Sequence, residues 1–482
     1  TLDKTSDSKS GGPNLFVKTG FEYFIDPTQS LGVSATLSDG IRNNENKTYT
    51  LDNGPGDKKY WRYTNGDGDR NGYDVNLNYD KKFTNPKQKL TSYLRFSDGL
   101  NDGLNEYYNN DDGGANYVYD DRAKNGQDGT SKSYNFKLDY THPFENDSKL
   151  EFGLNSKSTD RGDKQIAELF DETTKQYVAD RAFTNEFEYN ETVHAAYIQY
   201  GGALGFIGYN VGGRYETVDM MSELKTTNES FKNPYSSFYP SLSMSFGAPQ
   251  LLQIQTSYSK RVNRPRSRML NPFSNRQDSK NIRIGNPFLK PEYTDSYELN
   301  FSRFSRGVSL TLGGYYRHTT DKMERYKQVK EDGTSIATYA NINEQVSQGI
   351  EYSAVGSLGK KLRLMFSGSF YWDEINTELY GTDYDKTAKG QRMRVTTMWN
   401  INSTTEFMFF MFYMPARDIA IGKMDAMSFS SMSLKKKLMD ERLNLTLNIG
   451  DPFGLSGFRF ETWGDIDEDG IRDWYQDSDR NW

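Results

Sequence analysis

Apolar and polar residues alternate at every step in the stretch Tyr73-Asp74-Val75-Asn76-Leu77-Asn78-Tyr79-Asp80. The same period of two recurs in many other segments, and near the C-terminal end it runs through Leu443–Ile449. Successive side chains of a β-strand point to opposite faces, so each such stretch has one apolar and one polar face. Helical periodicity is nearly absent from the chain. The sequence therefore predicts an all-β, antiparallel fold.

Alternation alone does not separate a soluble β-sandwich from a membrane β-barrel, but the lengths of the connections do. Short turns and long connections follow one another in strict order. We expect short turns at 25–30, 84–88, 143–148, 201–205, 247–250, 305–307, 358–361, 402–405 and 439–441, and long ones at 38–70, 99–131, 157–185, 220–235, 263–292, 319–344, 374–389 and 415–425. A sandwich mixes lengths at both ends, whereas an outer-membrane barrel has short periplasmic turns and long extracellular loops. The pattern predicts a transmembrane, antiparallel, up-and-down β-barrel.

The composition fits the same architecture. Only 35% of the residues are hydrophobic, yet 14% are aromatic, including 34 tyrosines. Aromatic residues form belts at both membrane surfaces, where the ring is in the interface and the polar atom meets water. Five tyrosines stand near expected strand ends: Tyr23, Tyr79, Tyr140, Tyr200 and Tyr258. The plainer explanation is that tyrosine simply suits strands, but position and abundance together favour the belts.

Several classes of protein are disfavoured by what the sequence lacks. There is no cysteine, which excludes disulfide scaffolds and thiolate sites. The longest uninterrupted apolar stretch, Phe407–Met414, is far shorter than the ~18–20 residues of a membrane-spanning helix. The net charge of −7 gives no reason to expect nucleic acid as a partner. Three scattered histidines and the absence of hydrolase, metalloprotease and P-loop motifs indicate that the chain is not an enzyme.

The turn count also predicts how the chain fits into a barrel. Nine short turns imply about 18 strands. If the short turns are periplasmic, the first strand runs down from the outside and the last runs up towards it. A complete barrel begins and ends in the periplasm. We therefore expect residues 1–482 to be one barrel domain that lacks its first strands and its closing strand, with 454–482 as an acidic extracellular loop segment.

One segment resembles a known family. Arg264-Pro265, Leu270–Phe273, Gly285–Glu292 and Tyr297-Glu298-Leu299 form a series that resembles the barrel of TonB-dependent outer-membrane receptors, and in particular the outer-membrane β-barrel family. The resemblance implies a 22-stranded barrel in the outer membrane of a Gram-negative bacterium. It also implies an N-terminal plug, which we expect to be absent from this chain together with a TonB box.

The resemblance further implies a function and a set of partners. A TonB-dependent receptor takes up a scarce solute, which the long extracellular loops would bind. The expected partners are the lipid bilayer, lipopolysaccharide and, through the plug, TonB. The alternative from a different class is a non-transporting barrel that is a structural or docking subunit for a protein at the surface or in the periplasm.

The proline-rich series suits the rim of a long loop. Proline cannot donate to a strand ladder and fixes extended backbone where the chain leaves a sheet. We therefore interpret this series as a structural loop motif rather than as a set of direct ligand contacts. Its residues are Arg264, Pro265, Asn271, Pro272, Gly285, Asn286, Pro287, Lys290, Pro291 and Glu292.

One acidic stretch has the spacing of a calcium loop. Asp465, Asp467, Asp469 and Asp473 stand at positions 1, 3, 5 and 9, with Gly470 at position 6 for a sharp turn. Oxygen ligands at this spacing converge on Ca²⁺ in calcium-binding loops, and the pattern resembles thrombospondin type 3-like loops. Gln476 replaces the glutamate that an EF-hand has at position 12. The alternative is a solvated acidic loop that binds no ion. No other cofactor is expected.

Strand parity predicts which residues face the lipid. Each strand should present its apolar residues to the membrane and its polar residues to the interior of the barrel. The residues expected to face lipid are Phe366, Phe370, Leu443, Leu445 and Leu447. Those expected to face the interior are Arg363, Asn444 and Thr446.

Overall fold

A computed structural model describes residues 2–52, 58–110, 121–248, 252–273, 281–305, 307–329, 335–379, 382–419, 422–440, 442–454, 457–463 and 475–481. Within these ranges the chain is almost entirely antiparallel β-strand, apart from one short helix, α1 (Ser267–Leu270). No helix in this part of the chain is long and apolar enough to span a membrane. The predicted all-β fold is confirmed.

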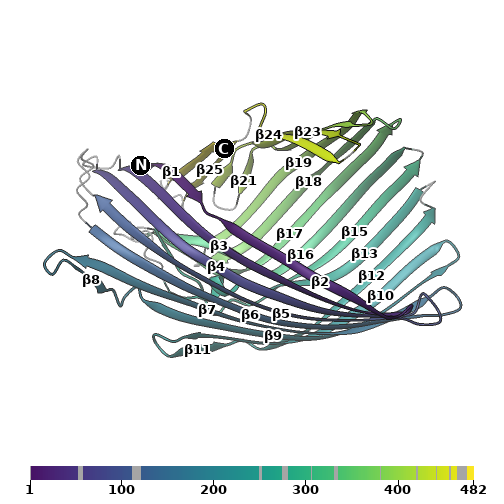
Figure 1. Ribbon diagram of the computed structural model, residues 1–482, viewed down its shortest axis with the longest axis horizontal. Coiled ribbons are helices and arrows are strands. Elements are labelled where there is room, and N and C mark those ends of the chain that lie inside the picture. The colour runs from purple at the N-terminus through teal and green to yellow at the C-terminus, as the bar shows by residue number, and fades with distance from the viewer. Residues whose placement is uncertain are drawn as a thin grey trace.

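Most of the strands belong to one continuous sheet, which curves like the wall of a barrel (Figure 1). The strands of this sheet are β1 (Leu2–Gly11), β2 (Asn14–Asp26), β3 (Gln29–Asp52), β4 (Lys58–Lys82), β5 (Lys89–Asn110), β6 (Asp121–Pro143), β7 (Lys149–Asp171), β8 (Gln176–Ala179), β9 (Asn185–Leu204), β10 (Ile207–Leu224), β11 (Glu229–Lys232), β12 (Tyr235–Ala248), β13 (Leu252–Asn263), β14 (Asn281–Arg283), β15 (Glu292–Ser305), β16 (Val308–Val329), β17 (Ser335–Leu358), β18 (Leu362–Leu379), β19 (Thr382–Asn402), β20 (Thr405–Met414), β23 (Met427–Leu438) and β24 (Leu443–Gly450). A second, four-stranded sheet consists of β21 (Arg417–Ile419), β22 (Gly422–Met424), β25 (Gly457–Trp463) and β26 (Tyr475–Asn481).

The main sheet has 22 strands, but these occupy fewer positions around the wall. Strands β1 and β2 lie end to end along β3, where Gly11 is opposite Asn43 and Asn14 is opposite Gly40. Strands β8 and β11 only extend hairpins, and β14 is a short loop strand that pairs in parallel with β17. The described residues therefore form eighteen successive wall strands, which confirms the predicted number. In this part of the chain β2 pairs with β3 and β24 with β23, so β2 and β24 are the two edges of the sheet.

The strand ends that flank the nine predicted short turns lie at one end of the wall, at the positions that the sequence predicts. Glycine in the left-handed region closes the turns at Gly205 and Gly359, with φ of 62° and 64°. The hairpins of β8 and β11 project from the opposite end (Figure 1). Because antiparallel strands alternate in direction, this arrangement places every short turn on the same side.

The long connections are shorter than the sequence predicts, because many of their residues belong to paired strands. Strands β3 and β4 pair from Gln29 and Lys81 as far as Asp52 and Lys58, across most of the predicted loop 38–70. Strands of 22 to 25 residues, such as β4 and β5, are about twice the ~9–11 residues that cross a bilayer. The outer part of such a hairpin extends beyond the length that crosses the bilayer, so it does not need the apolar alternation that marks a membrane strand.

The outer face of the wall is apolar. Register connects Phe366 of β18 to Val395 of β19 and to Met411 of β20, so these residues share one face of the sheet. Phe366 and Phe370 are both 42% exposed, and Leu443, Leu445 and Leu447 are also exposed. Arg363, Asn444 and Thr446 have the opposite parity and therefore lie on the other face. Exposed apolar side chains in a continuous band are expected where a barrel meets lipid.

Tyrosines of the outer face lie beside the short turns. The hydroxyl of Tyr79 donates a hydrogen bond to Gln29 Oε1 (2.7 Å), and that of Tyr140 accepts one from Gln88 Nε2 (2.6 Å). Tyr200 donates to Ser148 Oγ at 3.0 Å. Each ring thus continues the apolar band while its hydroxyl reaches the polar turn, which is the arrangement of an aromatic belt.

Candidate functional site

The most elaborate feature of the interior is the loop that joins β13 to β15, residues 264–291. Strand β13 ends at Asn263, and β15 begins at Glu292. Pro265 and Pro291 are buried at the two ends of this loop, where neither can continue a strand ladder. Pro272 and Pro287 are half-buried within it. Among the described residues of the loop, the helix α1 and strand β14 are short regular elements, and the other residues have no regular secondary structure.

The loop is anchored by an apolar core on the interior face of the wall. Leu270 at the end of α1 and Leu289 are 1% and 0% exposed. Both pack in one cluster with buried residues of the outer ends of three wall strands: Phe187, Tyr189 and Val193 of β9, Val218, Met220 and Leu224 of β10, and Met323 of β16. Full burial of a leucine side chain contributes about 1.5–3 kcal/mol. The loop is therefore docked against the wall.

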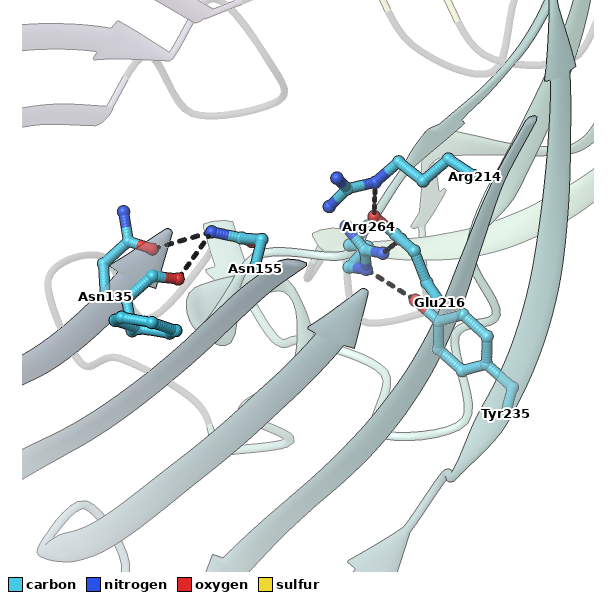
Figure 2. A network of polar contacts seen from close by, with 7 residues as sticks. Asn135, Asn155, Arg214, Glu216, Tyr235 and Arg264 are labelled. Carbon is cyan, nitrogen blue, oxygen red and sulfur yellow. Dashed lines mark hydrogen bonds and ion pairs between the residues drawn. The ribbon is translucent and has the colours of Figure 1, made fainter. Parts of the chain in front are cut away.

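A buried carboxylate holds the start of the loop. Glu216 of β10 is 5% exposed and lies between two guanidinium groups (Figure 2). Arg214 Nε donates to Glu216 Oε1 at 2.6 Å, and Arg264 pairs with Glu216 Oε2. Arg264 Nε also donates to the hydroxyl of Tyr235 at 2.7 Å. Burial alone would lower the pKa of Arg264, but its contacts with Tyr235 and Glu216 raise it overall, so the group stays charged.

A second buried carboxylate, Glu292, holds the end of the loop. One of its oxygens accepts a hydrogen bond from Asn263 Nδ2 at 2.7 Å. The other accepts from the backbone N–H of Met323 at 2.9 Å and lies 3.5 Å from Lys322 Nζ. Glu292 thus ties the last residue of β13 and the outer part of β16 to the first residue of β15. Each end of the loop is fixed by a buried carboxylate whose charged partners are partly buried.

Inside the loop, asparagine side chains and one glycine set the backbone. Asn271 Oδ1 accepts from the backbone N–H of Phe273, and Asn286 Oδ1 accepts from that of Phe288, at 3.1 and 3.0 Å. Gly285 donates its N–H to the carbonyl oxygen of Asn271 at 2.7 Å. A Cβ at position 285 would lie 2.5 Å from that same oxygen, so only glycine fits there.

A neighbouring hairpin clamps the far side of the loop. Asn341 of β17 accepts from the backbone N–H of Lys290 at 2.8 Å and donates to its carbonyl oxygen at 2.9 Å. Asn286 Nδ2 donates to the carbonyl oxygen of Tyr339 at 3.0 Å. On another hairpin, Asn233 donates to the carbonyl oxygen of Leu289 at 3.1 Å. All ten residues of the predicted loop motif lie in or directly beside this docked loop.

The wall beside the loop carries hydrogen-bonding side chains into the interior. Asn155 Nδ2 donates to Asn135 Oδ1 at 2.9 Å and to the carbonyl oxygen of Phe136 at 3.2 Å, on the same side of the wall as Arg214 (Figure 2). Tyr197 donates to Asp139. Amides, carboxylates and guanidinium groups at this density can bind a polar solute.

The predicted calcium residues Asp465, Asp467, Asp469 and Asp473 lie outside the described residues, as does the rest of 464–474. Among the residues that the structure does describe, no group of three or more His, Cys, Asp or Glu side chains could hold a metal ion. The calcium site therefore stays a prediction.

Sequence reasoning missed the partners of the loop. Glu216, Tyr235 and Asn341 were not singled out, although all three contact it. One weak signal was present for Glu216: it shares the parity of Arg214 in a segment whose other face carries Tyr215 and Val211. Parity places such a residue inside the barrel but does not identify its partner.

Comparisons with known proteins agree on the architecture. The family model described as "Outer membrane protein beta-barrel family" matches residues 81–480. The siderophore receptor PiuA from Acinetobacter baumannii is similar in structure, with a TM-score of 0.60, 11% identity, and coverage of 95% of this chain and 78% of that one. The ferric-catecholate import receptor Fiu from K12 E. coli has a TM-score of 0.59 at 10% identity, with coverage of 99% and 80%. At such identities the similarity shows the fold. The search of curated proteins finds no match.

Proposed function

Because the chain belongs to the outer membrane protein beta-barrel family, we propose that it is the barrel of a TonB-dependent receptor that takes up a scarce solute. Family membership places it in the outer membrane of a Gram-negative bacterium. Its uptake role is the proposal, and this role consists of binding and passage rather than catalysis.

The observation that carries the proposal is the shared fold over nearly the whole chain. The two solved structures named above are receptors according to their descriptions, and each is matched over more than nine-tenths of this chain. Fold alone does not define function, but the interior adds support. The loop has a buried apolar core and lies beside polar wall residues whose side chains could bind a solute.

The proposed mechanism separates a fixed part from a variable part. The loop 264–291 is held at both ends by ion pairs to buried carboxylates, and in this proposal it is the rigid floor against which a ligand is oriented. The outer hairpins are the variable part, and they supply the contacts that would be specific to a particular solute. Passage through the barrel would draw energy from TonB acting on a plug, and lipopolysaccharide would surround the outer band.

The experiment compares solute depletion by three strains: the parent, a strain that lacks this gene, and a strain that lacks tonB. Cells grow on a complex medium, and the solutes that remain are measured by mass spectrometry. We expect at least one solute to persist in the medium of both mutants and to disappear in the parent and in the complemented strain. Identical depletion by all strains, together with stable co-purification of a surface protein, would instead support a docking barrel.

A further inference from the structure

A pair of arginines on β19 has no role in the site described above. Arg392 and Arg394 belong to β19 and alternate with Met393 and Val395, which share the face of Phe366 and the other lipid-facing residues. The two arginines therefore point to the interior. They stand two positions apart on one face, about 6–7 Å along the strand.

Neither guanidinium has a carboxylate partner among the residues that the structure describes, and both side chains are exposed. Three other arginines of the interior face are paired with carboxylates. Arg95 lies against Asp74, Arg214 against Glu216 and Arg317 against Glu298. In contrast to these three, Arg392 and Arg394 are two adjacent positive charges without a carboxylate partner among the described residues.

Aromatic rings support these two arginines. The Cζ atom of Arg392 is 5.1 Å from the ring centroid of Tyr371, and that of Arg394 is 5.9 Å from the ring centroid of Phe410. Phe410 also contacts Phe429 of β23, with ring centroids 6.1 Å apart. A ring beneath a guanidinium restricts its orientation and leaves its N–H groups directed away from the ring.

The surroundings are apolar on one side and carry hydroxyls on the other. Phe412 belongs to β20. It is directly opposite Arg394 of β19 on one side and Phe429 of β23 on the other. On β18, Ser369 and Ser367 are opposite Arg392 and Arg394. The interior of a membrane barrel is normally polar, so three phenylalanines beside two unpaired arginines form an unusual surface. We call it the arginine–phenylalanine patch: Arg392, Arg394, Tyr371, Phe410, Phe412 and Phe429.

We propose that the arginine–phenylalanine patch binds a solute that carries an anionic group on an apolar or aromatic body. The two guanidinium groups bind the carboxylate or phosphate, since guanidinium N–H groups match such oxyanions in pairs. The phenylalanine rings contact the apolar body, and the serine hydroxyls add neutral donors. This assignment rests on the proposed uptake function, for which it names the chemical class of the solute.

The test measures binding of 2-naphthoate, an aromatic carboxylate, to the protein reconstituted in lipid nanodiscs. The variant is Arg392→Gln with Arg394→Gln. The matched control is Arg363→Gln with Lys435→Gln, which removes the same charge from the same face near the short turns. Heat-modifiable migration on gels verifies that each variant is folded. The neutral analogue 2-naphthamide tests whether charge decides binding.

We expect saturable naphthoate binding that weakens at least tenfold in the patch variant, and less than twofold in the control variant. Phe410→Ala should weaken it severalfold, and 2-naphthamide should bind weakly and equally to all proteins. Unchanged naphthoate binding by the patch variant would overturn the proposal, as would an equal loss in the control. Absence of saturable binding to the unmodified protein would also overturn it, and would indicate that another segment of protein covers the patch. Naphthoate binding needs no energy coupling by TonB, so the binding test and the uptake test can fail independently. Loss of the binding result would leave the uptake proposal standing, and a negative uptake experiment would leave the binding result unchanged.

Discussion

Replacing Leu289 by alanine should release the loop 264–291 from the wall. Leu289 is 0% exposed and is surrounded by the apolar cluster of β9, β10 and β16. Truncation of a buried leucine costs about 2–5 kcal/mol, from lost transfer energy and from the cavity that remains. The loop can open while the strand ladders stay paired, so this cost falls on the docking equilibrium of the loop. Since 1.36 kcal/mol is a factor of ten, opening should become about 30-fold to several thousand-fold more frequent.

Hydrogen–deuterium exchange of the protein in nanodiscs measures this opening directly. Backbone N–H groups that are bonded within the loop, such as those of Gly285 and Asn286, should exchange faster in the variant by that factor. Phe288→Ala is the matched control, because this neighbouring side chain is 74% exposed. The ring of Phe288 makes an edge contact with the ring of Phe231, with centroids 5.5 Å apart, and such a pair contributes about 0.5–1.5 kcal/mol. Phe288→Ala should therefore increase the exchange rates by about tenfold or less.

The result that refutes the reasoning is equal exchange in the two variants. Loop protection would then come from backbone hydrogen bonds alone, and the apolar cluster would not be the anchor. Faster exchange throughout β9 and β10 would also contradict it, because the wall would then depend on the loop.

Three further expectations follow from the same structure. Arg264→Met should cost about 1.5–3 kcal/mol of loop docking, the worth of a hydrogen bond to a charged group, and this is measurable by the same exchange experiment; an unchanged rate would show that the pair is not needed. Leu445→Arg should cost roughly 2–4 kcal/mol in a refolding titration, and Asn444→Arg less, because only position 445 is expected to face lipid; equal costs would refute the parity assignment. Asp467→Asn with Asp469→Asn should increase proteolysis of the last extracellular loop in millimolar calcium and leave the barrel unchanged; calorimetry that finds no calcium binding to the unmodified protein would favour a solvated acidic loop.

The strands and short turns could be predicted because their signals are local. Alternation over Tyr73–Asp80 fixes a strand and its two faces without knowledge of any other segment. The extent of the outer hairpins could not be predicted in this way. Asn43 and Asp67 pair in the β3–β4 ladder, although apolar and polar residues do not alternate around either of them. Backbone hydrogen bonds form the ladder and do not depend on side-chain alternation.

The loop contacts depended on residues that are distant in the sequence. Arg264 and Glu216 are 48 positions apart, and Lys290 and Asn341 are 51 apart. Proline and glycine spacing predicted a loop of restricted conformation, which the steric requirement at Gly285 illustrates. The order and register of the wall strands determine which strand supplies the buried carboxylate. The sequence does not contain this information, so only the structure identifies Glu216.

The central claim, that this wall spans the outer membrane with its short turns inside and its longer hairpins outside, is tested most directly by cysteine labelling. Residues 1–482 contain no cysteine, so a single substitution introduces one labelling site into this chain. Lys175 in the β7–β8 turn and Lys87 in the β4–β5 turn are a matched pair, with side chains that are 68% and 70% exposed. A membrane-impermeant maleimide should label Lys175→Cys in intact cells and should label Lys87→Cys only after the outer membrane is permeabilised. Labelling of Lys87→Cys in intact cells, or of neither position before permeabilisation, would contradict this account.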